Sequence, residues 1–462
     1  FDPWPGKCGA TGKGGDAYTS GFEGPWTSQP IVWDYEYFSN LLDYNWTKYQ
    51  GPGGRWQWGS GAAGPVAPAA DNASEVQDVM MMTTDISLLA DPLGAYQTII
   101  QEYAADDALF DNAFAHAWYK LTTRDMGPVT RCLGDMVPPA QDWQNPLPPP
   151  PTDLADFDDV RKSLSALMTA ANDAVMVPDV YDGEDNYGPL FVRLAYTCAS
   201  TFRQTDYLGG CNGARIRFSP MIDWPVNVAL DQALELLKPI KDKYGDGLSW
   251  ADLIALAGTQ ALQDLSPLEH TIPFCGGRTD AEDGTGTEYL EPRVSGSWND
   301  TIPLLRDTME VMGLTPREFV VLMGGGHSLG QMHADRTGFT GAWTETPTTL
   351  DSAYFTALLS EKWDEYTVPD TGEMQYKAEG KELYMLRTDL MLKADAEYRA
   401  IAEEYAVDEQ VFLEDFTAAW VKVMNLDRFD GPAGNLCHDK QRNRSGKRDD
   451  PTPAAAAAQE LF

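Results

Sequence analysis

The sequence is poor in basic residues and has no long apolar run. Its 462 residues include 34 Lys and Arg against 70 Asp and Glu, which gives a formal net charge of −36. A chain this acidic is not expected to bind nucleic acid or an anionic membrane, because the phosphate groups would be repelled. No segment reaches the roughly 18 consecutive apolar residues that a membrane span needs. The expected partners therefore include neither nucleic acid nor a membrane, whereas a cationic protein stays open.

Cysteine and histidine are scarce as well. The six cysteines show no metal-site spacing, so free thiols and a few disulfides both stay open; they are Cys8, Cys132, Cys198, Cys211, Cys275 and Cys437.

The chain starts at Phe1 instead of Met, from which we expect a processed chain in an organelle lumen, such as a plastid, or outside the cell. Four Asn-x-Ser/Thr triplets give weak support to secretion, at Asn45, Asn72, Asn299 and Asn443.

The length of 462 residues is enough for two or three domains, and the 43% of apolar residues can build sizeable cores. Ser249, with Asp252 three residues later, is a good N-cap for an apolar helix. Apolar side chains recur at helical spacing in five segments: Asp158–Ala171, Pro225–Tyr244, Ser249–Leu262, Thr301–Met312 and Leu383–Tyr405. The sequence therefore predicts a mainly α fold.

An internal repeat covers much of the chain. Three pairs of blocks recur in the same order: residues 19–42 with 337–359, 83–86 with 387–390, and 103–121 with 405–423. The offsets are all roughly 300 residues, far longer than the period of a solenoid repeat. The pattern indicates duplication of a whole domain.

The stretch VLMGGGHSLGQMHADRTGFTGAWT, residues 321–344, carries the most chemical information. Thr315 and Glu318 form a capping box ahead of it, and Pro316 suits the first helical position. His327 is therefore predicted near the C-terminal end of a buried helix, where glycines let a bulky group approach the backbone. A histidine held in this way could be an axial metal ligand or a core histidine bonded to a backbone carbonyl.

This stretch resembles the proximal-histidine segment of the intracellular type of haem peroxidases: ascorbate peroxidase, cytochrome c peroxidase and catalase-peroxidase. The resemblance implies a haem-peroxidase-like helical fold, a bound haem b and His327 as the ligand of its iron. Asp389 matches the aspartate that accepts the histidine N–H, which fixes the tautomer and makes the imidazole a more basic ligand. Trp343 matches the proximal tryptophan and could be redox-active or a packing residue.

The same resemblance implies a cation site on the proximal side. In some relatives oxygen ligands bind an ion there, here a K or Ca ion. The matching positions are Ser328, Thr344, Thr346 and Asp351. An ordinary capped turn is the alternative interpretation of these four residues.

Residues 191–203, FVRLAYTCASTFR, resemble the distal helix of the family, which carries Arg, an aromatic residue and His at positions i, i+3 and i+4. Here those positions hold Arg193, Tyr196 and Thr197, which share one helical face. The histidine is thus replaced by Thr197. Because the distal histidine shuttles a proton between the peroxide oxygens, its loss removes about two to four orders of magnitude of general acid–base catalysis. We expect impaired or altered peroxide chemistry.

The other distal residues are only partly informative. Arg193 could polarise bound peroxide or pair on the surface, but its apolar neighbours favour burial, where an arginine needs an anion or a propionate. Asn227 matches the residue that normally holds the distal histidine, and we expect it to hold water or Thr197 instead. Tyr196 replaces the tryptophan that catalase-peroxidases crosslink, so no catalase chemistry is expected.

The order of the repeated blocks resembles catalase-peroxidase, which has two tandem peroxidase domains. We expect a partial domain over residues 1–144 with a proximal half only, a Pro-rich linker over 145–152, a complete domain over 153–431 and a tail over 432–462. In the first domain, four residues match tryptophan, cation-site and aspartate positions: Trp26, Thr27, Asp34 and Asp85. No histidine matches the ligand position, so this domain is not expected to hold haem by itself.

Three functions follow from these observations. The first is a haem-binding pseudo-peroxidase with His327 as ligand over a weakened distal side. The second is a structural or assembly subunit of a larger complex, in which a partner polypeptide completes the first domain and covers its broken core. The third is an active ascorbate-type peroxidase, which the loss of the distal base disfavours.

Overall fold

A computed structural model describes Phe22 and residues 24–51, 54–69, 74–294, 296 and 299–437. The chain divides into two compact units, residues 1–122 and 123–462, which we call the first and the second unit. Among the described residues, no helix combines the length and the apolar character that crossing a membrane requires.

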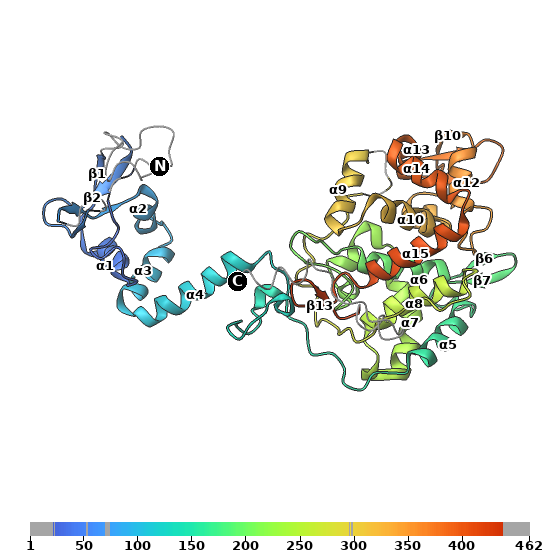
Figure 1. The fold of residues 1–462 in the computed structure, drawn as a ribbon, viewed down its shortest axis with the longest axis horizontal. Coiled ribbons are helices and arrows are strands. Elements are labelled where there is room, and N and C mark those ends of the chain that lie inside the picture. Colours follow the sequence, from blue (N-terminus) through green and yellow to red (C-terminus); the bar gives the residue numbers. More distant parts are fainter. Residues whose placement is uncertain are drawn as a thin grey trace, which may run out of the picture. The chain divides into compact units, whose positions relative to one another are not determined.

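The first unit combines helices with short antiparallel strands (Figure 1). Its elements are α1 (Glu36–Asp43), β1 (Thr47–Gln50), β2 (Trp56–Gly59), β3 (Val66–Pro68), β4 (Val76–Asp78), β5 (Met80–Met81), α2 (Thr83–Leu89), α3 (Ala95–Ala105) and α4 (Asp107–Thr123). The strands form a sheet in the order β1-β2-β5 and a separate β3-β4 pair. A small core joins Leu41, Met81 and Ile100, whereas α4 has no buried residue.

The second unit is mainly helical, which confirms the predicted fold class. Its helices are α5 (Phe157–Met168), α6 (Gly188–Ala199), α7 (Leu230–Tyr244), α8 (Trp250–Asp264), α9 (Ile302–Met312), α10 (Pro316–His327), α11 (Ala334–Thr337), α12 (Ala353–Ser360), α13 (Arg387–Ala394), α14 (Ala396–Tyr405) and α15 (Glu409–Met424). Single 3₁₀ turns are η2 (Val129–Arg131), η3 (Asp142–Gln144), η4 (Arg215–Arg217), η5 (Met221–Asp223), η6 (Pro225–Asn227) and η7 (Gly245–Gly247).

The strands of the second unit are short and antiparallel. They are β6 (Asp179–Tyr181) with β7 (Glu184–Asn186), β8 (Gln331–Met332) with β9 (Gly341–Ala342), β10 (Trp363–Thr367) with β11 (Met374–Ala378) and β12 (Tyr384–Met385), and β13 (Phe429–Asp430) with β14 (Gly434–Asn435). The helices supply most of the core, and the strands add a few buried residues to it, among them Ala378 on β11 and Met385 on β12.

Helix α8 lies at the centre of that core, with every residue from Ala251 to Leu262 buried. It packs against α5 and α6, while α15 packs against α6 and α10 (Figure 1). The approach of α6 depends on Gly258, because a Cβ at this position would lie 2.4 Å from the Cβ of Ala195. Ser249 caps α8 as predicted, by accepting the backbone N–H of Asp252 at 3.0 Å.

One predicted helix is broken in the structure. The segment Leu383–Tyr405 was expected to be continuous, but it contains strand β12 and two helices that meet at Asp395. The Asp395 side chain accepts the N–H groups of Glu397 and Tyr398, at 3.0 and 3.2 Å, and thereby caps α14. Apolar periodicity alone does not reveal such a break, because both helices bury faces at the same spacing.

Residues 123–152 belong to the second unit and pack against later parts of it. The Arg131 guanidinium lies 3.2 Å from the ring centroid of Tyr207, and Arg215 donates to the carbonyl of Asn145 at 3.1 Å. The two compact units therefore divide after residue 122, whereas the repeat pattern predicts the division at residue 144. At the other end, β14 lies in the segment that was predicted to begin the tail, and it pairs with β13 at the end of the predicted complete domain. Residues 438–462 lie outside the described residues.

Candidate haem site

Helix α10 has the predicted capping box and ends on His327. Thr315 and Glu318 cap it reciprocally, with backbone-to-side-chain distances of 2.8 and 3.2 Å. The glycines near its end admit aromatic rings, since a Cβ on Gly324 would lie 2.1 Å from the ring of Phe355. His327 is therefore fixed at the end of a rigid, buried helix.

The imidazole of His327 is held by the carboxylate of Asp389. Nδ1 of His327 lies 2.7 Å from Oδ1 of Asp389, which also accepts the hydroxyl of Tyr354 at 2.7 Å. The other oxygen, Oδ2, accepts the indole N–H of Trp343 at 2.9 Å and the backbone N–H of Leu386 at 2.7 Å. Since Nδ1 is occupied, Nε2 is the nitrogen left for a metal.

The electrostatics of this cluster favour an ionised carboxylate. Burial alone would raise the pKa of Asp389, but the charge and hydrogen bond of His327, with the bonds from Tyr354 and Leu386, hold it below the ordinary 3.8. Burial and the Asp389 charge raise the pKa of Tyr354 well above 10.0, so this phenol remains a donor. Trp343 stacks on His327, with ring centroids 4.5 Å apart and planes inclined by 18°.

The first unit contains the same network without a histidine. Oδ2 of Asp85 accepts the indole N–H of Trp26 at 2.9 Å and the backbone N–H of Met82 at 2.7 Å, and Oδ1 accepts the hydroxyl of Tyr37 at 3.0 Å. The single histidine of the unit, His116, lies on α4, where its Nδ1 is 2.8 Å from the carbonyl of Asn112. These contacts agree with the predicted pairing of the repeated blocks.

A cavity of about 890 Å³ opens beside His327. This volume lies within the range of cofactor and ligand pockets, roughly 300–1,000 Å³. Of the predicted site residues, the cavity brings together His327, Trp343, Arg193, Tyr196 and Thr197. Helix α6 thus faces the end of α10 across the cavity, as its resemblance to a distal helix predicts.

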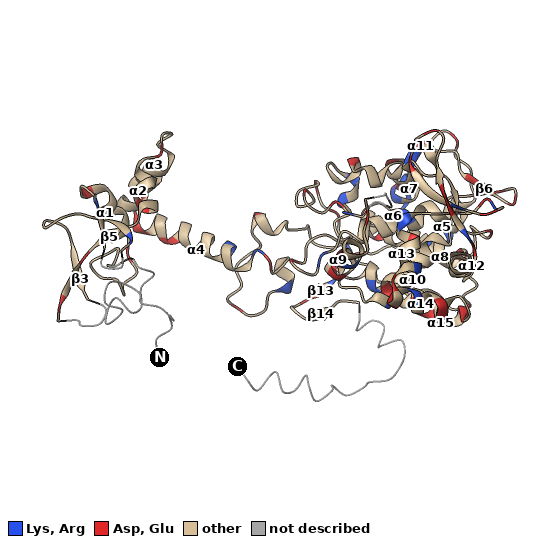
Figure 2. Ribbon diagram, turned by 90° about the horizontal axis from the view of Figure 1, so that it is seen from above, with Lys and Arg blue, Asp and Glu red and all other residues tan. Residues whose placement is uncertain are grey.

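Positive charge gathers at this cavity in an otherwise acidic chain. Arg193 on α6 and Arg336 on α11 both line it, and Figure 2 shows the basic residue on each helix in blue. Burial and the nearby Arg336 lower the pKa of Arg193 to about 10. Arg193 donates to the carbonyl of Val226 at 2.7 Å, and neither arginine has an ion-pair partner among the described residues. Two neighbouring unpaired guanidinium groups favour an anionic ligand.

The distal side has no titratable base where the family resemblance predicts one. Thr197 is buried at the cavity wall, and burial raises the pKa of Tyr196 to about 12. Asn227 is buried and donates from Nδ2 to the carbonyl of Met221 at 2.5 Å, while its Oδ1 has no partner among the described residues. The expected bond between Asn227 and Thr197 is therefore absent from the described contacts. The orphan acceptor lies next in sequence to Val226, which lines the cavity.

The residues predicted to bind a cation are engaged in local hydrogen bonds. Ser328 donates to the carbonyl of Gly325 at 2.8 Å, Thr344 to the carbonyl of Ser328 at 3.1 Å, and Thr346 to Asp351 at 2.9 Å. Among the described residues, no group of three or more His, Cys, Asp and Glu side chains is arranged to hold a metal. The K or Ca ion stays a prediction.

Three residues that contact the His327 network or line the cavity were not identified from the sequence. Tyr354 recurs in the repeat as Tyr37, and that pairing was a usable signal for its role. Arg336 lies on the short helix α11 and His333 at its N-cap. Neither has a comparable signal, because nothing in the sequence pattern says which side chains of so short a helix face a cavity. In the structure, Nε2 of His333 lies 2.7 Å from Oδ1 of Asp179, and both residues line the cavity.

Comparison with known proteins gives a consistent result. The family model described as peroxidase matches residues 160–408. The chain is 38% identical over 469 residues to a catalase-peroxidase of Salinibacter ruber, 39% over 458 residues to one of Natronomonas pharaonis, and 36% over 473 residues to catalase-peroxidase 2 of Legionella pneumophila. These matches cover 92%, 91% and 94% of the chain.

The same matches cover 61%, 61% and 59% of the three relatives, so the chain spans about three fifths of their length. The family match over residues 160–408 includes both walls of the cavity, with α6 on one side and α10 on the other. It also includes His327 and the Asp389 carboxylate that holds it. The chain belongs to the peroxidase family, and these three relatives, which it matches over part of their length, are catalase-peroxidases.

Proposed function

We propose that the second unit binds haem b and reacts with hydrogen peroxide more slowly than a peroxidase with a distal histidine. One observation carries the proposal: a complete His327–Asp389–Trp343 network faces a helix on which Thr197 stands at the position of the base. The His327–Asp389–Trp343 network supports retained haem binding. The threonine at the position of the base supports weakened peroxide chemistry.

The residues around the cavity fit a haem. Nε2 of His327 is the nitrogen available for iron, and Asp389 would keep the imidazole oriented and basic. Arg193 and Arg336 provide cationic groups for the two carboxylates of the porphyrin or for another anion. The orphan Oδ1 of Asn227 is an acceptor without a donor, as expected where a histidine N–H has been lost.

A bound haem would supply an iron centre that coordinates and reduces peroxide. Arg193 would hold the peroxide by hydrogen bonds and stabilise negative charge on the departing oxygen. Thr197 cannot accept the peroxide proton at neutral pH, because a hydroxyl is far too weak a base. Proton transfer would then depend on water, which keeps the reaction slow.

The first test is an absorption spectrum of the purified protein with haem, for the native chain and for His327→Gln. We expect a Soret band in the native chain and its loss or marked shift in the variant. The matched control is His116→Gln, which alters the exposed histidine of the first unit and should leave the spectrum unchanged. Absence of a Soret band from the haem-supplied native chain refutes the ligand assignment.

The second test restores the base with Thr197→His. We expect the rate of reaction with peroxide to rise by about 10²–10⁴-fold, because a general base becomes available. The unpartnered Oδ1 of Asn227 should orient the new imidazole, so Thr197→His/Asn227→Leu should lose part of the gain. Thr197→Gln is the control of similar size without a base. Equal rates for the His and Gln variants would rule out the distal-base argument, and a native rate typical of active relatives would favour the ascorbate-type alternative.

A second candidate function is a subunit of a larger assembly, and the surface of the first unit favours it. Phe114, Trp118 and Leu121 on α4 are 38%, 56% and 67% exposed. Their counterparts in the repeat, Phe416, Trp420 and Val423, are buried. We propose that further polypeptide segments equivalent to α6, α8 and α10, which cover α15 in the second unit, cover this α4 face.

Analytical ultracentrifugation of the native protein and of Trp118→Glu tests this candidate. If the α4 face is an interface, the native protein sediments as a complex and the variant as a smaller species. A monomeric native protein that binds a hydrophobic dye on this face would contradict the assembly. The matched control is Tyr289→Glu, another exposed aromatic residue, located in the second unit.

A further inference from the structure

Two disulfides lie inside the second unit. Cys198, on α6, is bonded to Cys211, and Cys275, which follows α8, is bonded to Cys437. All four residues are 9% exposed or less, whereas Cys132 is half-buried and has no disulfide partner among the described residues. Cys8 lies outside the described residues. The sequence left free thiols and disulfides open, and the structure decides for disulfides in these two pairs.

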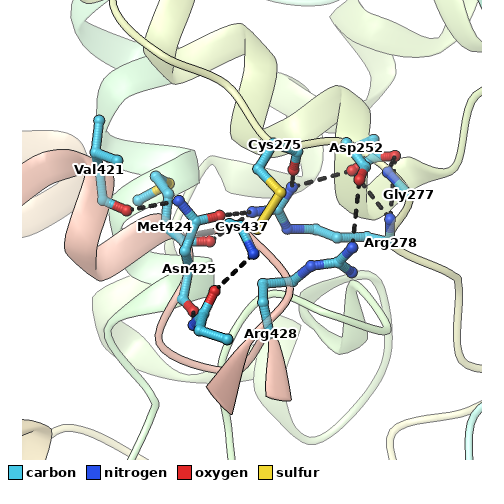
Figure 3. The surroundings of a disulfide bond; sticks show 11 residues. Asp252, Cys275, Gly277, Arg278, Val421, Met424, Asn425, Arg428 and Cys437 are labelled. Carbon is cyan, nitrogen blue, oxygen red and sulfur yellow. Dashed lines mark hydrogen bonds and ion pairs between the residues drawn. A yellow bond between two sulfur atoms is a disulfide. The ribbon is translucent and has the colours of Figure 1, made fainter. Parts of the chain in front are cut away.

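The second disulfide is built into the core. Figure 3 shows it beside Arg278, which pairs with Asp252 at 3.0 Å while both side chains are buried. Arg278 also donates to the carbonyl of Cys275 at 2.6 Å. Bonds enclosed in this way must form while the chain folds, and such bonds are rare where glutathione keeps thiols reduced. Two buried disulfides are therefore typical of a chain that folds in an oxidising compartment.

One Asn-x-Thr triplet has both of its polar side chains exposed to solvent. Asn45 and Thr47 lie between α1 and the start of β1, and both are exposed. Trp46 between them turns inward: its indole N–H donates to the carbonyl of Asn40 at 3.3 Å, and its ring packs on the core cluster that contains Leu41. The two side chains that glycosylation requires therefore face solvent together.

The other triplets lack this arrangement or lie outside the described residues. Asn299 is exposed, but the hydroxyl of Thr301 accepts the N–H of Leu304 at 3.3 Å and caps α9. Asp300 between them is buried. The triplets at Asn72 and Asn443 include residues that the structure does not describe.

We propose that this chain folds in an oxidising secretory compartment and carries an N-linked glycan on Asn45. The donor is an oligosaccharide activated as a lipid diphosphate. Nδ2 of Asn45 forms a bond to C1 of the first sugar, the bond from C1 to the diphosphate oxygen breaks, and Nδ2 loses one proton. No oxidation or reduction accompanies the transfer. The glycan gives the edge of the β1–β2 hairpin a hydrophilic cover.

The test is peptide mapping of the protein from its native source, without reduction, before and after treatment with a glycan-removing amidase. We expect a linked Cys198–Cys211 peptide, and an Asn45 peptide that becomes detectable only after treatment, as aspartate. The variants are expressed in the secretory pathway of a eukaryotic host, and the electrophoretic mobility of each is compared before and after amidase treatment. Asn45→Gln and Thr47→Ala should remove the mobility shift that comes from the Asn45 glycan, while Thr47→Ser should retain it.

An unmodified Asn45 in protein with intact disulfides would overturn the glycan assignment. Free thiols at Cys198, Cys211, Cys275 and Cys437 would overturn the compartment. A glycan on Asn299 with Asn45 bare would contradict the argument from the inward turn of Trp46. None of these readouts depends on haem, so they are independent of the proposed peroxide chemistry.

Discussion

Trp118 of α4 is 56% exposed, whereas Trp420, its counterpart on α15, is 1% exposed. The ring contacts along the two helices are nevertheless alike. Phe110, Phe114 and Trp118 are spaced at 5.9 and 5.9 Å between centroids. The corresponding rings on α15, Phe412, Phe416 and Trp420, are spaced at 6.0 and 6.3 Å.

The two helices differ in whether other helices pack over their aromatic rings. In the second unit the indole N–H of Trp420 donates to Thr259 of α8 at 3.1 Å, and Phe416 packs against Gly325 of α10. The described part of the first unit has counterparts of α12 to α15 but none of α8 or α10. Local sequence therefore sets the spacing of the rings along each helix, and the covering helices decide whether those rings form a core.

The sharpest test of this comparison is a matched pair of truncations, Trp420→Ala and Trp118→Ala. Losing the buried ring should cost about 3–5 kcal/mol, because a cavity is left behind. Losing the exposed ring should cost less than about 0.5 kcal/mol. Hydrogen exchange measured by mass spectrometry separates the two units. An equal loss of protection in both would mean that the α4 face is covered in solution.

The loss of a disulfide should affect the stability of the two units differently. Breaking the Cys198–Cys211 bond with Cys198→Ser/Cys211→Ser should lower the unfolding free energy of the second unit by about 2–4 kcal/mol. The first unit should be unaffected, since residues 1–122 contain a single cysteine, Cys8. Denaturant unfolding followed by hydrogen exchange provides the measurement, with Cys132→Ser as the control. Destabilisation of the first unit to the same extent would show that the two do not unfold independently.

A smaller effect concerns pH. The folded state lowers the pKa of Asp389 below 3.8, so its ionised form contributes stability above that pH, and the contribution is lost as pH falls through the folded value. The difference in unfolding free energy between the native chain and Asp389→Asn should shrink as the pH falls below about 4. Acid titration of tryptophan fluorescence measures it. A difference that grows on acidification would mean that the carboxylate is protonated in the folded chain.

Much of the proximal side could be predicted from the sequence, because its features are local or repeated. Thr315 and Glu318 specify where α10 begins, and the spacing from there places His327 at the end of the helix. The repeat linked Trp343 and Asp389 to Trp26 and Asp85 before any contact was known.

The rest depends on packing between distant segments. The break at Asp395 arises from a cap that competes with helical continuity, and Arg336 reaches the cavity through a short helix with no periodic signal. The unpartnered Oδ1 of Asn227 is visible only when its whole surroundings are known. Cysteine spacing could not predict the Cys275–Cys437 bond, because 162 residues separate the two.

The carboxylate of Asp389 has two separate uses. It caps α13 through the N–H of Leu386, and it holds His327 and Trp343. Loss of the histidine would remove only one of these uses. Asp85 illustrates the outcome, since it still caps α2 and still accepts Trp26 and Tyr37 in a unit whose single histidine lies elsewhere. An aspartate and a tryptophan at these positions are therefore a record of ancestry and folding, and only the histidine itself is informative about haem.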